Sequence, residues 1–94
     1  MEDIIYVYKQ QKYSVIAAKA VEIPVRKPLA QVLEELDHTG SFLMVERGYI
    51  VNLFHVEKLE GEQIYLDNGS ALPVSRNRLK ETREAITKYW RKML

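Results

Sequence analysis

The residue types that most often carry chemistry in proteins are sparse in this 94-residue chain. Its two histidines, His38 and His55, match no metal-ligand spacing. It has no cysteine, which excludes disulfides, zinc–thiolate sites and thiol catalysis. Its serines lie outside any Gly-x-Ser-x-Gly context, and its glycines are scattered at expected turns rather than gathered in a phosphate-binding loop. We therefore expect no enzyme: no catalytic residues, no metal and no cofactor.

Basic and polar side chains instead gather in three expected connections between strands. These are KQQKY at 9–13, ERG at 46–48 and SRNR at 75–78. Long basic side chains on loops suit phosphates, and an arginine can bridge O6 and N7 of guanine in the major groove. On one face, the three connections would form a nucleic-acid-binding surface without a recognition helix. Any β-rich domain also has polar loops, so the residues alone leave both interpretations open.

Size and composition indicate one globular domain over residues 1–94. Hydrophobic residues make up 47% and charged residues 29% of the chain, which is typical of a folded protein. No apolar run approaches the roughly 18 residues that cross a bilayer. The acidic start, MEDIIYVYKQQ, lacks the basic region of a signal peptide. Since the absence of cysteine also fits a reducing compartment, we expect a cytoplasmic protein.

The charge is unevenly distributed. Residues 76–94 carry seven basic and two acidic side chains, whereas residues 1–75 carry seven basic and eleven acidic ones. Such asymmetry marks either an end that faces a polyanion or the solvated face of a C-terminal helix, where cations suit the helix dipole. On charge alone we prefer the solvated helix.

The strands expected to position the three connections are short and antiparallel. They cover 4–8, 13–18 with a continuation over 20–25, 41–45, 49–54, and two further segments within 56–66. Pro24 indicates an edge position. Glu46-Arg47-Gly48 is expected to be a tight reversal in which Gly48 takes a left-handed conformation. Asn68 and Gly69 predict a type I′ hairpin turn that pairs 62–66 with 70–74.

Two helices complete the expected fold, which is mainly β with one middle and one C-terminal helix. The middle helix opens at Pro28, carries an apolar stripe from Leu29 to Leu36, and ends near Asp37 and His38, before Gly40. Ser75 is expected to cap a final helix that starts at Arg76. The apolar side of that helix is expected to hold Leu79, Ile86 and Met93, flanked by Tyr89 and Trp90.

Three segments together resemble the LytTR DNA-binding domain, the output domain of many bacterial response regulators in two-component systems. FLMVERGYIVN at 42–52 matches the family pattern F-x-R-x-H-R-S-x-hydrophobic-V-N. Gly69 and the run 72–76 match a turn glycine followed by L-P-V-S-R, and Ile4–Val7 with Tyr13-Ser14 match the first strands. The resemblance runs from about Ile4 to the C-terminus and implies elongated antiparallel β-sheets of the LytTR type.

The resemblance implies a transcription regulator that lays loops, not a helix, into DNA grooves. The base-reaching positions of the family fall on Lys12, Tyr13, Glu46, Arg47 and Arg76. Arg78 is a candidate phosphate contact by its charge. Structural roles fall on Gly48, Asn52, Asn68, Gly69 and Ser75, with the Asn52 amide expected to bond nearby backbone at a strand end. The implied partners are double-stranded DNA, a second copy on repeated sites and an N-terminal receiver domain, with no membrane.

The chain departs from the family pattern on its proposed DNA-facing segment. Met44 replaces an arginine, Glu46 a histidine and Gly48 a serine. A carboxylate is repelled by phosphates, although it can accept a hydrogen bond from cytosine N4. Family domains usually have another strand before the one that Ile4–Val7 matches, so we expect either a domain excised from a longer regulator or a divergent minimal member. The alternative function is a LytTR-like protein-interaction or regulatory module without DNA affinity.

Overall fold

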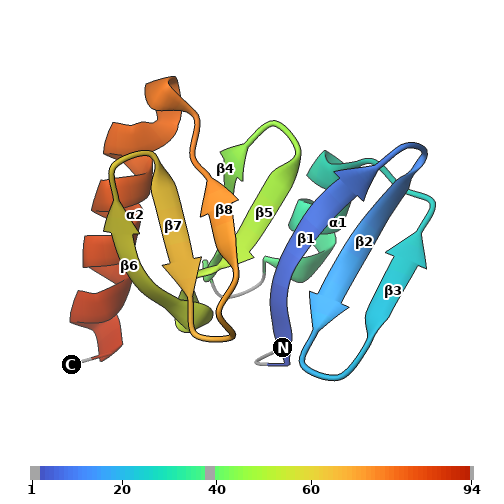
Figure 1. Cartoon of the computed structure of the whole chain (residues 1–94), viewed down its shortest axis with the longest axis horizontal. Coiled ribbons are helices and arrows are strands. Elements are labelled where there is room, and N and C mark those ends of the chain that lie inside the picture. The colour runs from blue at the N-terminus through green and yellow to red at the C-terminus, as the bar shows by residue number, and fades with distance from the viewer. Residues whose placement is uncertain (1–2, 38–39, 94) are drawn as a thin grey trace.

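The computed structural model describes residues 3–37 and 40–93, and two antiparallel sheets dominate it (Figure 1). The five-stranded sheet has the order β3-β2-β1-β5-β4, and the three-stranded sheet has the order β6-β7-β8. The strands are β1 (Ile4–Gln10), β2 (Tyr13–Ala18), β3 (Glu22–Val25), β4 (Phe42–Glu46), β5 (Tyr49–Asn52), β6 (Val56–Glu60), β7 (Gln63–Leu66) and β8 (Ala71–Pro73). The helices are α1 (Leu29–Leu36) and α2 (Leu79–Met93), with short 3-10 turns η1 (Leu53–His55) and η2 (Arg76–Arg78). The mainly antiparallel β fold with two helices is therefore confirmed.

β3 is a strand of its own and not the predicted continuation of β2. The chain reverses after Ala18, whose N–H donates to the Val21 carbonyl at 2.9 Å. β3 then runs antiparallel to β2, with Val25 opposite Ser14, and forms the outer strand that Pro24 predicted. The reversal has a consequence for the site, because it brings the connection between β3 and α1 to the same end of the sheet as the β1–β2 turn.

Two hydrophobic clusters hold the elements together. In the smaller one, α1 packs Leu29 and Val32 against Val7 and Ile50 of the five-stranded sheet. The larger cluster joins β4 and β5 to the three-stranded sheet and α2. Its buried members are Ile5, Val45, Val51, Leu53, Val56, Ile64, Leu66, Leu72, Val74 and Ile86. Since β4 and β5 contribute to both clusters, the turn that joins these two strands is anchored from both sides.

The β4–β5 pair contains a bulge next to its turn. Met44 pairs with Ile50 and Glu46 pairs with Tyr49, so Val45 is the extra residue. Val45 is fully buried in the larger cluster, whereas Met44 packs partly buried against the smaller one. Bulges bend a strand and redirect its side chains, and this one sets the direction in which residues 46–48 leave the sheet.

The β7–β8 hairpin forms as predicted, but with a different turn. Gly69 N–H donates to the Leu66 carbonyl at 3.0 Å, and Leu66 N–H donates to the Ser70 carbonyl at 2.9 Å. Gly69 has a φ of 91°, and among the described non-glycine residues only Gln11 has a positive φ. A type I′ turn needs a positive φ at both central residues. The loop is therefore a three-residue turn closed by a left-handed glycine, and the type I′ prediction is wrong.

The C-terminal helix starts later than predicted. Residues 76–78 form η2, and α2 begins at Leu79. Ser75 stands at the cap position of η2, but its side chain makes no capping hydrogen bond. Thr82 and Ile86 are buried along α2, while Met93 is 61% exposed, so the expected apolar side covers only part of the helix. The predicted end of α1 at His38 lies outside the described residues.

The molecule is only slightly longer than it is wide. Its extents are 34 × 27 × 24 Å, and its radius of gyration is 12.3 Å. A compact chain of this length has a radius of gyration of about 12 Å. The elongation that the family resemblance implies is therefore modest here.

Candidate nucleic-acid interface

The three connections predicted to form a surface lie at one end of the molecule, shown at the top of Figure 1. One backbone hydrogen bond joins the first two connections, and a second fixes the third connection to the end of β4. Lys9 N–H donates to the Gly48 carbonyl at 2.9 Å, and Ser75 N–H donates to the Val45 carbonyl at 2.9 Å. The β3–α1 connection meets the β1–β2 turn at the same end, because Val25 pairs with Ser14. We call residues 9–13, 26–28, 46–48 and 75–78 the loop end.

Two grooves cross the loop end. The first groove has a volume of about 470 Å³, and the second has a volume of about 640 Å³. The charged, aromatic and sulfur-bearing side chains of the first groove are Lys9, Lys12, Tyr13, Arg26, Lys27, Met44 and Arg47. The second groove is lined by Lys9, Glu46, Arg47, Gly48, Ser75, Asn77 and Arg78. Lys9 and Arg47 line both, so the two grooves form one continuous basic surface.

The carboxylate of Glu46 is bonded to its own turn. Its Oε1 accepts a hydrogen bond from Arg47 N–H at 2.7 Å, and its Oε2 accepts one from Gly48 N–H at 3.4 Å. A carboxylate that accepts backbone N–H groups has part of its charge compensated locally. Glu46 therefore closes the β4–β5 turn and helps to fix the direction of Arg47.

The sequence and the fold were compared with those of known proteins. The family model of the LytTr DNA-binding domain matches residues 1–87. The chain belongs to the LytTR family. A solved structure of the LytTr DNA-binding domain of a protein described as a methyl-accepting/DNA response regulator from Bacillus cereus is similar to it in fold. The TM-score is 0.80 at 23% sequence identity, and the match covers 90% of this chain and 82% of that one. No curated protein is significantly similar in sequence.

Gly48, where the LytTR pattern has serine, does not use the conformational freedom of glycine. The described glycines with positive φ are Gly40, Gly61 and Gly69, so the expectation of a left-handed Gly48 is wrong. A Cβ added at Gly48 would meet no neighbouring atom closer than 3.9 Å. The β4–β5 reversal at residues 46–48 forms without a left-handed glycine and is closed by the hydrogen bonds of Arg47 and Gly48 N–H to the Glu46 carboxylate. A serine would therefore fit at position 48.

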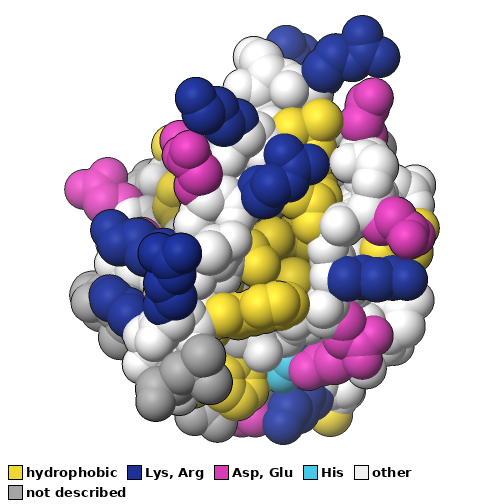
Figure 2. Space-filling model, turned by 90° about the vertical axis from the view of Figure 1, so that its left-hand side faces the viewer, with side chains coloured by type: hydrophobic (Ala, Val, Ile, Leu, Met, Phe, Trp, Pro, Cys, Tyr) yellow, Lys and Arg dark blue, Asp and Glu magenta, His cyan; other side chains and the backbone are white. Residues whose placement is uncertain are grey.

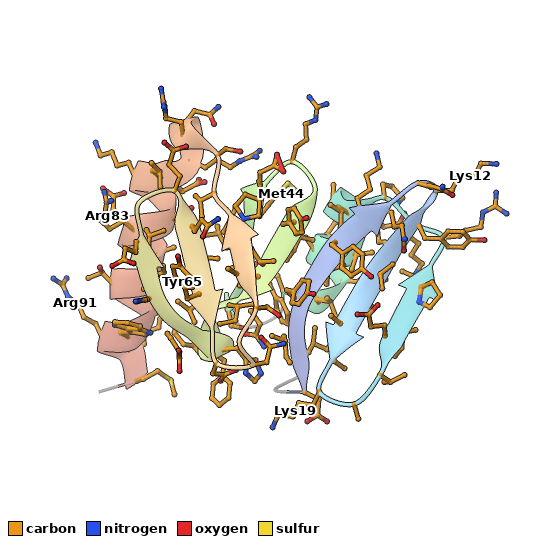
Figure 3. All side chains as sticks on the ribbon, in the orientation of Figure 1. Lys12, Lys19, Met44, Tyr65, Arg83 and Arg91 are labelled. Carbon is orange, nitrogen blue, oxygen red and sulfur yellow. The ribbon has the colours of Figure 1, made fainter. Side chains whose placement is uncertain are left out.

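Arg76 is the predicted contact that the structure places apart from the grooves. It lies in η2, and its guanidinium donates to Oε2 of Glu62 in the β6–β7 turn at 3.4 Å. The Arg76 side chain is 86% exposed and lines neither groove. The other predicted DNA-facing residues line the grooves: Lys12 and Tyr13 the first, Glu46 and Arg78 the second, and Arg47 both. Figure 3 shows Lys12 extending from the β1–β2 turn away from the sheet.

Arg26 and Lys27 come from a segment outside the three predicted connections, and Lys9 and Asn77 lie within those connections but are not among the predicted DNA contacts. Lys9 lies at the centre of the loop end, Asn77 lines the second groove, and Arg26 and Lys27 line the first. The Arg-Lys-Pro run before α1 is visible in the sequence. Its position could be inferred only by treating 22–25 as a separate strand, because a continuous β2 would carry it to another part of the sheet.

Asn52, the asparagine of the LytTR V-N pair, is 2% exposed and bonds backbone on two sides. Its Nδ2 donates to the Ile4 carbonyl at 2.7 Å, and its Oδ1 accepts from Phe54 N–H at 3.1 Å. It thereby ties the start of β1 to the end of β5. At the β7–β8 hairpin, Oδ1 of Asn68 similarly accepts from Ser70 N–H at 3.0 Å.

The basic residues of α2 lie outside both grooves. Figure 2 shows Lys and Arg side chains on this side of the molecule, with acidic side chains between them and a band of hydrophobic side chains. Arg83, Arg91 and Lys92 are exposed, and none of them lines the loop-end grooves. The part of the C-terminal charge excess that lies on α2 therefore belongs to a helix face outside the grooves, whereas Arg78 of η2 lines the second groove.

No group of three or more His, Asp or Glu side chains in residues 3–37 and 40–93 could hold a metal ion. Within the same residues, no helix has the length and apolar character needed to span a bilayer.

Proposed function

We propose that this LytTR domain binds double-stranded DNA through its loop end and acts as a transcription regulator. One observation carries the proposal: cations from four separate segments line two adjoining grooves. They are Lys9, Lys12, Arg26, Lys27, Arg47 and Arg78. The carboxylate among the lining residues, Glu46, is bonded to backbone N–H groups of its own turn. Such a surface suits a polyanion, and family membership makes DNA the expected polyanion.

Arg47 has the central role in this proposal. It stands at the tip of the β4–β5 turn and lines both grooves. Its planar fork of donors can bond a guanine edge or a phosphate bidentately. Lys12 and Tyr13 would contact DNA on one side of this tip and Arg78 on the other, while Glu46 shapes the tip instead of repelling the duplex.

Arg76 would join the interface by exchanging Glu62 for DNA. Its ion pair is exposed on both sides and 3.4 Å long, and exposed pairs of this kind contribute little to stability. The exchange would therefore cost little free energy.

The family suggests the wider setting. In this proposal the domain is the output part of a bacterial two-component response regulator in the cytoplasm. An N-terminal receiver domain controls it, and two copies bind side by side on repeated sites.

Polarisation titrations on random and selected duplexes over a range of salt concentrations test the proposal. We expect the logarithm of the binding constant to fall linearly with the logarithm of the salt concentration. Arg47→Ala should reduce discrimination for the selected site by about 1–3 kcal/mol. Arg83→Ala is the matched control, because Arg83 is exposed on α2 and lines neither groove.

The second candidate function is a protein-interaction or regulatory module that has kept the fold without DNA affinity. Met44, Glu46 and Gly48, which replace arginine, histidine and serine of the LytTR pattern, favour it. An absence of salt-sensitive binding at micromolar protein would support this module and contradict the DNA proposal.

A further inference from the structure

The first groove is more strongly basic than the second. Its charged lining side chains are Lys9, Lys12, Arg26, Lys27 and Arg47, with no carboxylate among the residues that line it. The second groove combines Lys9, Arg47 and Arg78 with the carboxylate of Glu46 and the neutral groups of Ser75 and Asn77. Both grooves also hold neutral polar groups, which include Gln11 and Tyr13 in the first. The larger number of cations and the absence of a lining carboxylate make the first groove the better match for phosphates.

The β3–α1 connection that forms one wall of the first groove is held at both ends. Ser14, which is 1% exposed, donates its hydroxyl to the Lys27 carbonyl at 2.6 Å. On the other side, the Pro28 carbonyl accepts from Val32 N–H at 3.1 Å, and Leu29 is buried against the sheet. The backbone of residues 26–28 is thus fixed before any ligand arrives, which lowers the entropic cost of binding.

The two cations of this connection are not equivalent. The Lys27 ammonium donates to both carboxylate oxygens of Glu35, at 2.9 and 3.1 Å. The hydrogen bond from Lys27, with a second from Gln31, lowers the pKa of the Glu35 carboxyl. The positive charge of Lys27 is therefore paired with the Glu35 carboxylate of α1. Arg26 is exposed and forms no ion pair with a carboxylate of the described residues, so its guanidinium is available at the groove.

We infer that the first groove is a seat for the DNA sugar–phosphate backbone, and that Arg26 is a phosphate contact supplied by the β3–α1 connection. This connection lies outside the positions to which the LytTR pattern assigns base contacts. The inference rests on the proposed function, because it assumes that the tip at Arg47 enters a DNA groove.

The position of the first groove beside Arg47 is the physical reason to expect a phosphate strand there. A tip placed in the major groove is flanked by sugar–phosphate strands. The first groove begins at Arg47 and extends over Lys12 and Arg26, so its cations lie beside the inserted tip, where a strand would pass. Arginine matches phosphate oxygens bidentately and remains charged at all working pH values.

Salt-dependent titrations of Arg26 variants test the inference. The wild type, Arg26→Gln, Arg26→Lys and the control Arg83→Gln are titrated with a selected and a random duplex at several salt concentrations. We expect Arg26→Gln to weaken binding by the same factor on both duplexes and to reduce the salt slope by about 0.9, the value for one lost phosphate contact. Arg26→Lys, which keeps the charge, should retain the wild-type slope.

The outcomes separate this inference from the proposed function. If Arg26→Gln matches Arg83→Gln while Arg47→Ala still weakens binding, the inference is overturned and the proposed function stands. If Arg26→Gln weakens binding to the selected duplex alone, Arg26 contacts bases and the phosphate assignment is wrong. A wild type without salt-sensitive binding overturns both. Circular dichroism verifies that the variants fold, as expected for substitutions of an exposed side chain.

Discussion

At the scale of single residues, the tip at 46–48 changes how the departures from the LytTR pattern are understood. From the sequence, Glu46 is expected to repel phosphates. In the structure its carboxylate accepts N–H groups of Arg47 and Gly48 and so organises the turn. The place of Glu46 in a turn could be predicted from the sequence. The direction of its carboxylate could not, because it depends on how the bulge at Val45 orients the end of β4.

Gly48→Ser is expected to strengthen DNA binding without destabilising the fold. Gly48 has no positive φ, and a Cβ there meets no atom closer than 3.9 Å. Replacing a glycine at such a position lowers the entropy of the unfolded chain, which raises stability by about 0.4–1 kcal/mol. The new hydroxyl would also face the second groove, where it can bond a phosphate.

Gly48→Ala is the matched control for this prediction. It shares the entropic gain but adds no hydroxyl. Thermal unfolding and polarisation titration of the two variants separate the effects. Equal DNA affinity for Gly48→Ser and Gly48→Ala would show that the hydroxyl makes no contact, and a loss of stability in both would contradict the backbone argument.

At the scale of elements, the sequence patterns predict most of the strands, and the errors have local physical causes. The apolar and β-branched runs place the strands correctly, because burial of alternate side chains decides them. The turn at 67–69 differs from the prediction because Asn-Gly also suits a three-residue loop. At Ser75 the side chain makes no capping hydrogen bond, and the chain enters a 3-10 turn before α2 begins. The sequence predicts β3 as a continuation of β2 because no glycine or asparagine marks the reversal at 19–20.

Helix α2 carries one polar side chain on its buried face. Thr82 is fully buried, and its hydroxyl has no hydrogen-bond partner among the described residues. An unsatisfied buried hydroxyl lowers stability by its desolvation cost. We therefore predict that Thr82→Val, which keeps the shape of the side chain, raises the free energy of unfolding by about 1 kcal/mol.

Chemical denaturation measures this effect, with Thr87→Val as the matched control on the same helix. Thr87 is exposed, so its substitution should change stability little. If Thr82→Val is less stable than the wild type, the hydroxyl has a favourable interaction and the reasoning about the packing of α2 is wrong.

At the scale of the whole molecule, the convergence of four segments makes the site, and only part of it is predictable from the sequence. Antiparallel hairpins place alternate turns at one end of a sheet, so the neighbours of any one turn can be anticipated. The pairing of β1 with β5 joins residues far apart in the chain, and it brings Lys9 onto Gly48. Long-range pairing of this kind has no local signal, which is why the contact of Lys9 with Gly48 and the place of Arg26 at the groove emerge only from the structure.

The opposite end of the molecule provides an internal reference for the central claim. It holds the β2–β3 turn, with Lys19, and the β7–β8 hairpin (Figures 1 and 3). Lys19 is also a cation, so DNA binding that depended on charge alone would involve the end that holds Lys19 as well. A DNA contact that depends on the loop end would not.

The most direct test is a titration of the isotope-labelled protein with a selected DNA duplex, followed by amide chemical shifts. We predict large shifts at Lys9, Gly48 and Asn77, and little change at Lys19 and Gly69 at the opposite end. Shifts that are absent from the loop end, or that are equal at the two ends, would contradict the claim that the loop end is the DNA-binding surface.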